Sequence, residues 1–188
     1  PESPVATPEP TTAITSTVGP RSATAEAILA AYTDHVVGRG GQADRFQAVL
    51  DARSRSVRNA RPAEGRFPVV LYLTSASSHP LENVVLFETL ARQGYVIAAV
   101  PSVGQNRTPQ DRGTRGIHNQ LDDVLASIRA LDDLPYADTD HLGVVGYSRG
   151  GQVATLLTML RPDIAAFVSL GGAEGRPTLL PALGASPC

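Results

Sequence analysis

The sequence predicts an α/β fold: a mostly parallel sheet with helices on both faces. The first observation is a set of short apolar runs rich in β-branched residues, which are typical of strands buried on both faces. The second is that segments with helical spacing separate these runs, as crossovers between parallel strands require. The chain has 188 residues, enough for one domain with a full core. The expected strands are 67–73, 95–100, 141–147 and 164–170.

Residues 1–21 are rich in Pro, Thr and Ser and carry few bulky apolar side chains. Such a segment cannot bury enough apolar surface to offset the entropy that ordering would cost. We therefore expect a disordered leader, followed by a single α/β domain over 22–188. A leader of this kind often follows a removed export signal, which favours a secreted or periplasmic protein. The tail of a cytoplasmic protein fits this composition nearly as well.

Two helices are expected before the first strand. Ser22 or Thr24 can cap the first helix, whose apolar positions recur at helical spacing as far as the glycines that begin at Gly38. A second, shorter helix is expected within 44–60. Residues 62–65 contain Pro and Gly and predict the turn that leads into strand 67–73.

From residue 67 onward, strands and helices alternate. Helical spacing predicts the helices 81–93, 118–134 and 150–160. In a parallel sheet, ligands bind beyond the carboxyl ends of the strands. The segments that should meet at this edge are therefore 74–80, 101–117, 147–150 and 171–176.

Gly146-Tyr147-Ser148-Arg149-Gly150 matches the pattern G-x-S-x-G between an expected strand and an expected helix. A turn this tight places the serine in a strained backbone conformation, and side chains two positions to either side would collide. Gly146 and Gly150 remove that collision. The pattern predicts that Ser148 is a nucleophile whose hydroxyl projects above the sheet, with Tyr147 packed beneath the turn. A plain glycine-rich turn is the alternative.

Backbone N–H groups near Ser148 can stabilise the negative charge that develops on a substrate oxygen. The N–H of Arg149 opens the following helix, where the helix dipole is positive. A second donor is expected from the polar loop after strand 67–73, at Ala76 or, as the near alternative, Ser75. An ordinary polar loop without this role is also compatible with these residues.

Residues 65–172 resemble the α/β-hydrolase superfamily, and within it the dienelactone hydrolase-like and platelet-activating-factor acetylhydrolase-like bacterial esterases. The resemblance implies a serine hydrolase that acts on small-molecule carboxylic esters through an acyl-enzyme on Ser148, with no metal or organic cofactor. An amide or peptide hydrolase of the same fold, or a catalytically dead binding module, are the alternatives. The stretches that carry the resemblance are GRFPVVLYL, ENVVLFETLARQGYVIAAVPSVG, the helix around 121–124 and HLGVVGYSRGG.

The sequence departs from this resemblance in the position of the histidine that should activate Ser148. In α/β-hydrolases the acid and then the histidine follow the serine, but all 4 histidines of this chain precede Ser148. We expect His141 at the far end of its strand and His35 at the surface. We expect His118 to begin a helix on the side of the site. His79 should lie in a solvated loop, with a place in the pocket wall as the alternative.

The nearest carboxylate after strand 164–170 is Glu174, which is therefore the candidate acid. The fold needs further strand–helix units after Ser148 to deliver an acid and a histidine, and the chain ends at Cys188. We therefore expect the C-terminal strands of the domain to be missing, the histidine to lie beyond Cys188, and this chain to be inactive by itself. Strand 164–170 would then be an unprotected apolar edge that favours aggregation.

Charge and composition limit the classes of partner that the sequence predicts. All 16 basic residues are Arg, against 18 acidic residues, and the net charge is −2. The Arg residues are scattered among acids, so no basic stripe predicts a nucleic-acid partner. The apolar runs are of strand length, which is too short for a membrane span. The single cysteine excludes an intramolecular disulfide. The sequence leaves the oligomeric state open.

Overall fold

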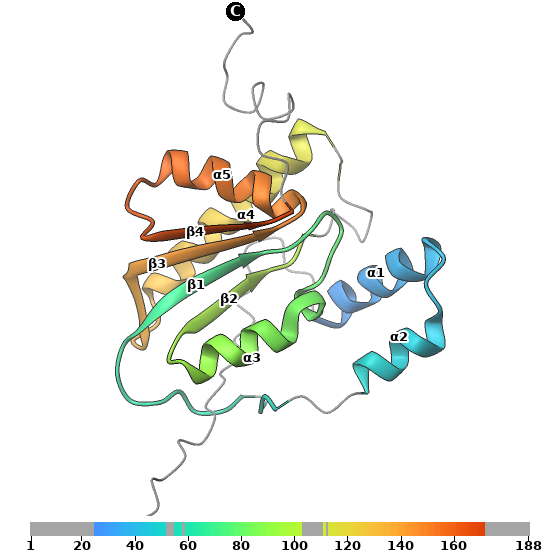
Figure 1. The fold of residues 1–188 in the computed structure, drawn as a ribbon, viewed down its shortest axis with the longest axis horizontal. Coiled ribbons are helices and arrows are strands. Elements are labelled where there is room, and N and C mark those ends of the chain that lie inside the picture. The colour runs from blue at the N-terminus through green and yellow to red at the C-terminus, as the bar shows by residue number, and fades with distance from the viewer. Residues whose placement is uncertain (1–24, 52–54, 58, 103–110, 112, 172–188) are drawn as a thin grey trace, which may run out of the picture.

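The computed structural model describes residues 25–51, 55–57, 59–102, 111 and 113–171. The expected leader over 1–21, the candidate acid Glu174 and Cys188 lie outside these residues. Figure 1 shows a twisted sheet between helices, with two further helices at the right of the view, beside the ends of the strands.

The sheet has β1 (Phe67–Leu73), β2 (Val96–Val100), β3 (Ala137–Tyr147) and β4 (Ala166–Leu170). Across the described residues the strand order is β2-β1-β3-β4, and every pairing is parallel. Leu71 in β1 stands opposite Ala98 in β2 and Val144 in β3. The predicted parallel sheet is confirmed, and the carboxyl ends of all these strands share one edge.

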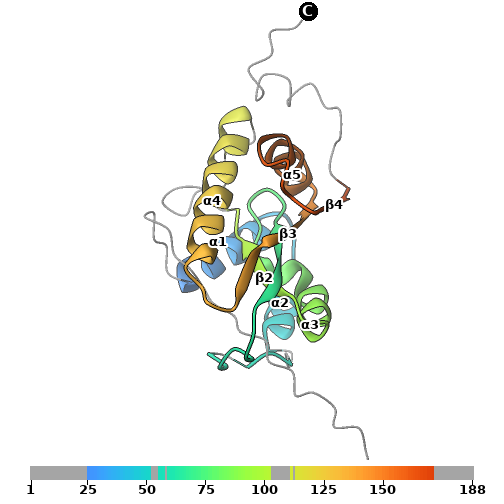
Figure 2. The same cartoon turned by 90° about the vertical axis from the view of Figure 1, so that its left-hand side faces the viewer.

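The helices that connect the strands cover opposite faces of the sheet. They are α3 (Val84–Arg92), α4 (Thr114–Asp132) and α5 (Arg149–Leu160). The step from β1 to β2 and the step from β2 to β3 run in opposite directions across the sheet. Because such crossovers are right-handed, their helices fall on opposite faces. Figure 2 shows α3 and α4 on the two sides of β1.

The main core lies between the sheet and the pair α4 and α5. Its fully buried members come from alternate positions of β1 and β3 and from the inner faces of the two helices: Val69, Leu71, Leu73, Leu142, Val144, Val124, Ile128, Val153 and Leu157. On the other face, the Tyr72 ring packs against Phe87 of α3 in a T-shaped contact, with 4.8 Å between ring centroids. β1 is therefore held by side chains on both of its faces.

The two N-terminal helices are α1 (Ala25–Gly38) and α2 (Ala43–Leu50), as the sequence predicts. Tyr32 of α1 makes an edge contact with Phe46 of α2, with 5.5 Å between ring centroids. The same tyrosine stacks on His79, at 5.8 Å. These contacts place α1 against the loop that follows β1, at the edge where the strands end (Figure 1).

The start of α4 differs from the prediction. The helix begins at Thr114, four residues before the expected start at His118. Gly116 made this segment resemble a loop because glycine is a poor helix former. In the structure a Cβ at Gly116 would lie 1.7 Å from the Asp111 carbonyl oxygen, so a close backbone approach requires glycine inside the first turn.

The starts of β3 and α3 also differ from the prediction. β3 begins at Ala137 rather than His141, because Ala137 and Asp138 pair with the start of β1. A register shift between Pro68 and Val69 then leaves residues 139–141 without partners in β1. Pro68 has no N–H to continue the ladder. The expected helix 81–93 starts as the 3₁₀ helix η1 (Pro80–Asn83) and becomes α-helical at Val84.

The expected apolar edge is confirmed for the described residues. β4 pairs only with β3, and Phe167, Val168 and Leu170 are 40 %, 47 % and 38 % exposed. No helix in the described part of the chain is long and apolar enough to cross a membrane.

Candidate active site

The turn between β3 and α5 gives Ser148 an unusual backbone. Its φ is 52° and its ψ is −116°, a conformation that L residues rarely adopt. Two backbone hydrogen bonds hold it there, from Ser148 N–H to the Leu170 carbonyl and from Gly151 N–H to the Ser148 carbonyl, both 3.0 Å. Such strain persists only where surrounding structure enforces it, and it is concentrated at functional sites.

The two glycines of the motif lie where backbones approach one another closely, as the sequence predicts. A Cβ at Gly146 would lie 2.4 Å from the Gly150 carbonyl oxygen. A Cβ at Gly150 would lie 1.9 Å from the Leu73 carbonyl oxygen. No side chain fits at either distance, so the turn brings the start of α5 directly over the end of β1.

Arg149 supplies the first N–H of α5, and its side chain connects the turn to the segment before α4. The guanidinium is buried and donates a hydrogen bond to the Asp111 carbonyl, just before α4. The missing side chain of Gly116 provides the space, since a Cβ there would lie 2.6 Å from Arg149 Nη1. The positive end of the α5 helix dipole therefore lies beside Ser148.

A cavity of about 490 Å³ opens beside Ser148. Ser148 adjoins its wall, because Tyr147 precedes it in the chain and Leu170 accepts its N–H. The lining residues come from α1, from the segment after β1 and from the ends of β3 and β4: Tyr32, Val36, Ser75, Ala76, Ser78, Glu82, Asn83, Tyr147 and Leu170.

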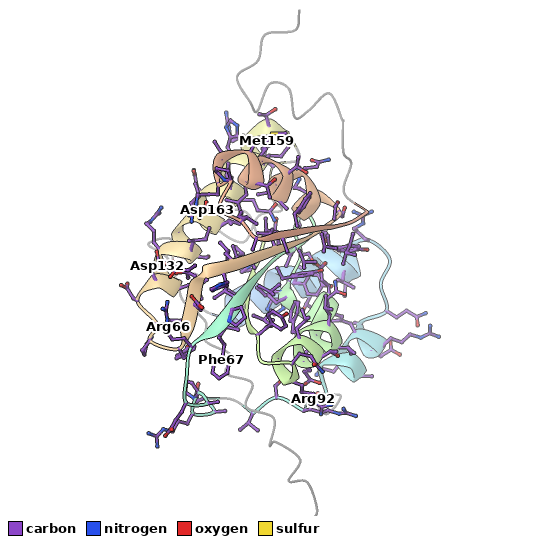
Figure 3. The ribbon with its side chains drawn as sticks, turned by 60° about the vertical axis from the view of Figure 1, so that its left-hand side comes forward. Arg66, Phe67, Arg92, Asp132, Met159 and Asp163 are labelled. Carbon is purple, nitrogen blue, oxygen red and sulfur yellow. The ribbon has the colours of Figure 1, made fainter. Side chains whose placement is uncertain are left out.

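The cavity lies at the carboxyl edge of the sheet, as the sequence predicts. In Figure 3 the labelled Arg66, Phe67, Asp132 and Asp163 mark the opposite edge, on the left of the view, where strands begin. At that edge Asp138 pairs with Arg66 at 3.4 Å and with His141 at 2.8 Å. His141 is therefore far from Ser148, as expected.

Tyr147 does not pack beneath the turn, so that expectation is wrong. Its side chain is 41 % exposed and lines the cavity. The position beneath the turn is filled instead by backbone, because Gly146 and Gly150 bring main-chain atoms together there. Tyr147 therefore offers an aromatic surface to a ligand in the cavity.

The loop after β1 distinguishes the two candidates for the second oxyanion donor. Ser75 N–H donates to Glu82 Oε1 at 3.1 Å, so this N–H already has a partner, which favours Ala76 over Ser75 as the candidate donor. Ala76 follows it in the loop and lines the cavity. Ser77 comes next with a φ of 58°, a second strained non-glycine residue beside the site.

Glu82 is the residue at this site that the sequence analysis missed. Its carboxylate accepts hydrogen bonds from Tyr72 Oη at 3.1 Å, from Ser75 Oγ at 3.0 Å and from Ser78 Oγ, in addition to Ser75 N–H. Asn83 donates its side-chain amide to Tyr72 Oη. A signal was present in the sequence, because a polar Glu-Asn pair interrupts the otherwise apolar start of the expected helix.

Among the described side chains, Ser148 Oγ has no hydrogen-bond partner. His79 lies in the segment after β1 and is half-buried rather than fully solvated, and it is not among the residues that line the cavity. Burial lowers the pKa of His79 to about 4, and its ring stacks on Tyr32. His118 lies exposed inside α4 rather than at its start, and the side chain of His35 is outside the described residues.

The described residues hold no group of three metal-ligating side chains. Glu174, the candidate acid, lies outside them. Glu82 is a carboxylate in the cavity wall, and its four hydrogen bonds face the loop and β1.

The parallel sheet, the order of its helices and the strained serine turn at its carboxyl edge define an α/β-hydrolase fold. A ferulic acid esterase from Streptomyces cinnamoneus shares this fold with a TM-score of 0.53 and 19 % identity, over 70 % of this chain and 50 % of the esterase. The family model of the dienelactone hydrolase family matches residues 56–183. Because this match covers more than half of the chain, the protein belongs to the dienelactone hydrolase family.

Two peptidases are also similar to this chain. Dipeptidyl-peptidase 5 of Porphyromonas gingivalis is 30 % identical over 95 residues, which cover 46 % of this chain and 14 % of that protein. The acylaminoacyl peptidase of Pyrococcus horikoshii has a TM-score of 0.49 and 21 % identity, over 59 % of this chain and 19 % of the peptidase. The chain therefore spans half or less of the length of these relatives.

Proposed function

We propose that this protein is a serine hydrolase of carboxylic esters and that Ser148 is its nucleophile. The observation that carries the proposal is the strained turn at Ser148, which exposes a hydroxyl beside a cavity at the carboxyl edge of the sheet. Membership in the dienelactone hydrolase family supports the same chemistry. The substrate is a small ester, consistent with a cavity of about 490 Å³.

The reaction follows from this placement. Ser148 Oγ attacks the ester carbonyl carbon, and the C=O electron pair moves onto the oxygen, which becomes negative. The N–H groups of Arg149 and Ala76 stabilise that oxygen. The C=O bond then reforms as the alcohol leaves with the proton that Ser148 has lost, and water hydrolyses the acyl-enzyme that remains to the acid and the free serine.

The described residues provide no evident base to remove the proton from Ser148. A serine hydroxyl is a weak nucleophile without an adjacent base. The described histidines leave Ser148 Oγ without a hydrogen bond, and the described carboxylate in the cavity is already engaged. On this proposal the well-placed serine of the isolated chain is acylated slowly, and its turnover of esters is slow or absent.

Labelling with a fluorophosphonate probe tests the nucleophile. We expect wild type to be labelled on Ser148, identified by peptide mass spectrometry, and Ser148→Ala to lose the label. Ser127→Ala is the matched control, because Ser127 lies on α4 and bonds to the Asp123 carbonyl, and it should label like wild type. A folded wild-type chain that stays unlabelled would instead favour a catalytically dead binding module.

A peptide hydrolase is the second candidate, because a curated relative that is similar to part of this chain is a dipeptidyl-peptidase. Both reactions use the same acyl-enzyme, so labelling does not separate them. The two reactions are separated by single-turnover acylation with a p-nitrophenyl ester and with an aminoacyl p-nitroanilide. Acylation by the ester alone supports the first candidate, and release of nitroaniline dependent on Ser148 supports the second.

A further inference from the structure

The carboxylate of Glu82 joins the loop that carries Ala76 to a rigid strand. Ser75 donates both its N–H and its hydroxyl to Glu82, and Ser78 donates its hydroxyl. These two serines bracket Ala76, the cavity-lining candidate for the second oxyanion donor. The loop between them also holds the strained Ser77, so its conformation needs support from outside.

Tyr72 is the residue of β1 to which Glu82 is hydrogen-bonded. Its ring is buried in β1, and its hydroxyl donates to Glu82 at 3.1 Å. Burial, and secondly the negative charge of Glu82, raise the pKa of the Tyr72 phenol well above its usual value. Tyr72 therefore stays protonated and remains a hydrogen-bond donor across the working pH range.

We propose that Glu82 is a positioning residue for the oxyanion hole: its carboxylate holds residues 75–78 so that Ala76 N–H faces the cavity on the side opposite Arg149. This inference rests on the proposed function, because it concerns the same site. Glu82 acts through the loop and does not touch the reacting atoms. A shift of about 1 Å in a group that positions the chemistry can cost on the order of 100-fold in rate.

The test compares Glu82→Gln with Glu88→Gln. Glu88 is a matched carboxylate, because it too accepts two backbone N–H groups and a serine hydroxyl, from Arg55 and Ser56, away from the cavity. We expect Glu82→Gln to lower the maximal rate of fluorophosphonate labelling by about 10- to 100-fold with little change in the probe's half-saturating concentration. We expect Glu88→Gln to label at the wild-type rate, even where its melting temperature falls as much.

A second measurement does not depend on reactivity. Amide hydrogen exchange should show that Ser75 N–H is protected in wild type and in Glu88→Gln, and that the segment 75–78 exchanges faster in Glu82→Gln. Unchanged exchange there would overturn the inference, because Glu82 would not be holding the loop.

The outcomes also separate this inference from the proposed function. If wild type is labelled on Ser148 and Glu82→Gln labels equally fast, the inference fails and the proposed function stands. The same holds if Glu88→Gln slows labelling as much as Glu82→Gln, because the effect would then be general destabilisation. If folded wild type is not labelled at all, the proposed function fails and takes the inference with it.

Discussion

At the scale of single residues, the site depends on one serine with a strained backbone conformation. It also depends on two neighbouring positions where only glycine fits. Ser148 has a φ of 52°, and Gly146 and Gly150 make the contacts that hold it there. The strain is confined to the turn, but one of the contacts that enforce it comes from a remote part of the chain, because Gly150 lies against the carbonyl of Leu73 in β1. A methyl group at Gly150 must therefore separate α5 from the end of β1.

We predict that Gly150→Ala destabilises the fold by about 3 kcal/mol, because overpacking at a backbone contact cannot be relieved by a side-chain rotation. Gly143→Ala is the control in the neighbouring strand β3, where a Cβ would meet its nearest heavy atom at 3.8 Å. We expect Gly143→Ala to stay within about 1 kcal/mol of wild type. Denaturant unfolding measures both, and equal values for the two variants would contradict the prediction.

At the scale of elements, the site is formed where α1 meets the segment after β1. Tyr32 of α1 stacks on His79 and lines the cavity, and burial raises the pKa of the Tyr32 phenol. The contact buries a histidine in its neutral form, because burial lowers the pKa of His79 to about 4. The packing of α1 against this segment should therefore depend on pH.

The sign follows from the two states of His79. The unfolded chain has a histidine pKa of about 6.5 and binds the proton first as pH falls, so stability decreases between pH of about 6.5 and about 4. At about 1.4 kcal/mol per pKa unit, the loss is at most about 3 kcal/mol, and residual solvent contact reduces it. Denaturant midpoints across this range measure it. His79→Phe keeps a ring beside Tyr32 and should flatten the slope.

The exposed His118 is the control for this prediction. His118→Asn also removes one histidine, but an exposed one on α4 outside the contact between Tyr32 and His79, so it controls for the loss of a histidine as such. A slope that persists in His79→Phe would show that another group carries the acid sensitivity.

At the scale of the whole molecule, the described sheet has one bare edge. β2 and β4 are both edge strands, but Phe167, Val168 and Leu170 expose large apolar side chains along β4. Unpaired backbone groups beside apolar side chains are a template for pairing with another chain. This edge is the feature of the fold that should govern how the chain behaves in concentrated solution.

We predict that Val168→Lys lowers the rate of aggregation several-fold, followed by light scattering at matched concentration. Val85→Lys is the matched control, because Val85 is 73 % exposed but lies on helix α3, which offers no strand edge. The two variants share the added charge, so equal protection by both would show that net charge, and not the β4 edge, sets the rate.

The parallel sheet, its strands and the serine turn with its two glycines could be predicted from the sequence, because they follow from local patterns: apolar runs, helical spacing and a five-residue motif. The groups that surround Ser148 could not, because they are brought together by packing. Glu82 reaches Ser75 and Tyr72 across an intervening turn, Tyr147 turns toward the cavity, and α4 starts early because Gly116 meets the Asp111 carbonyl. These depend on distances between segments remote along the chain or separated by irregular turns, and no spacing in the sequence encodes such distances.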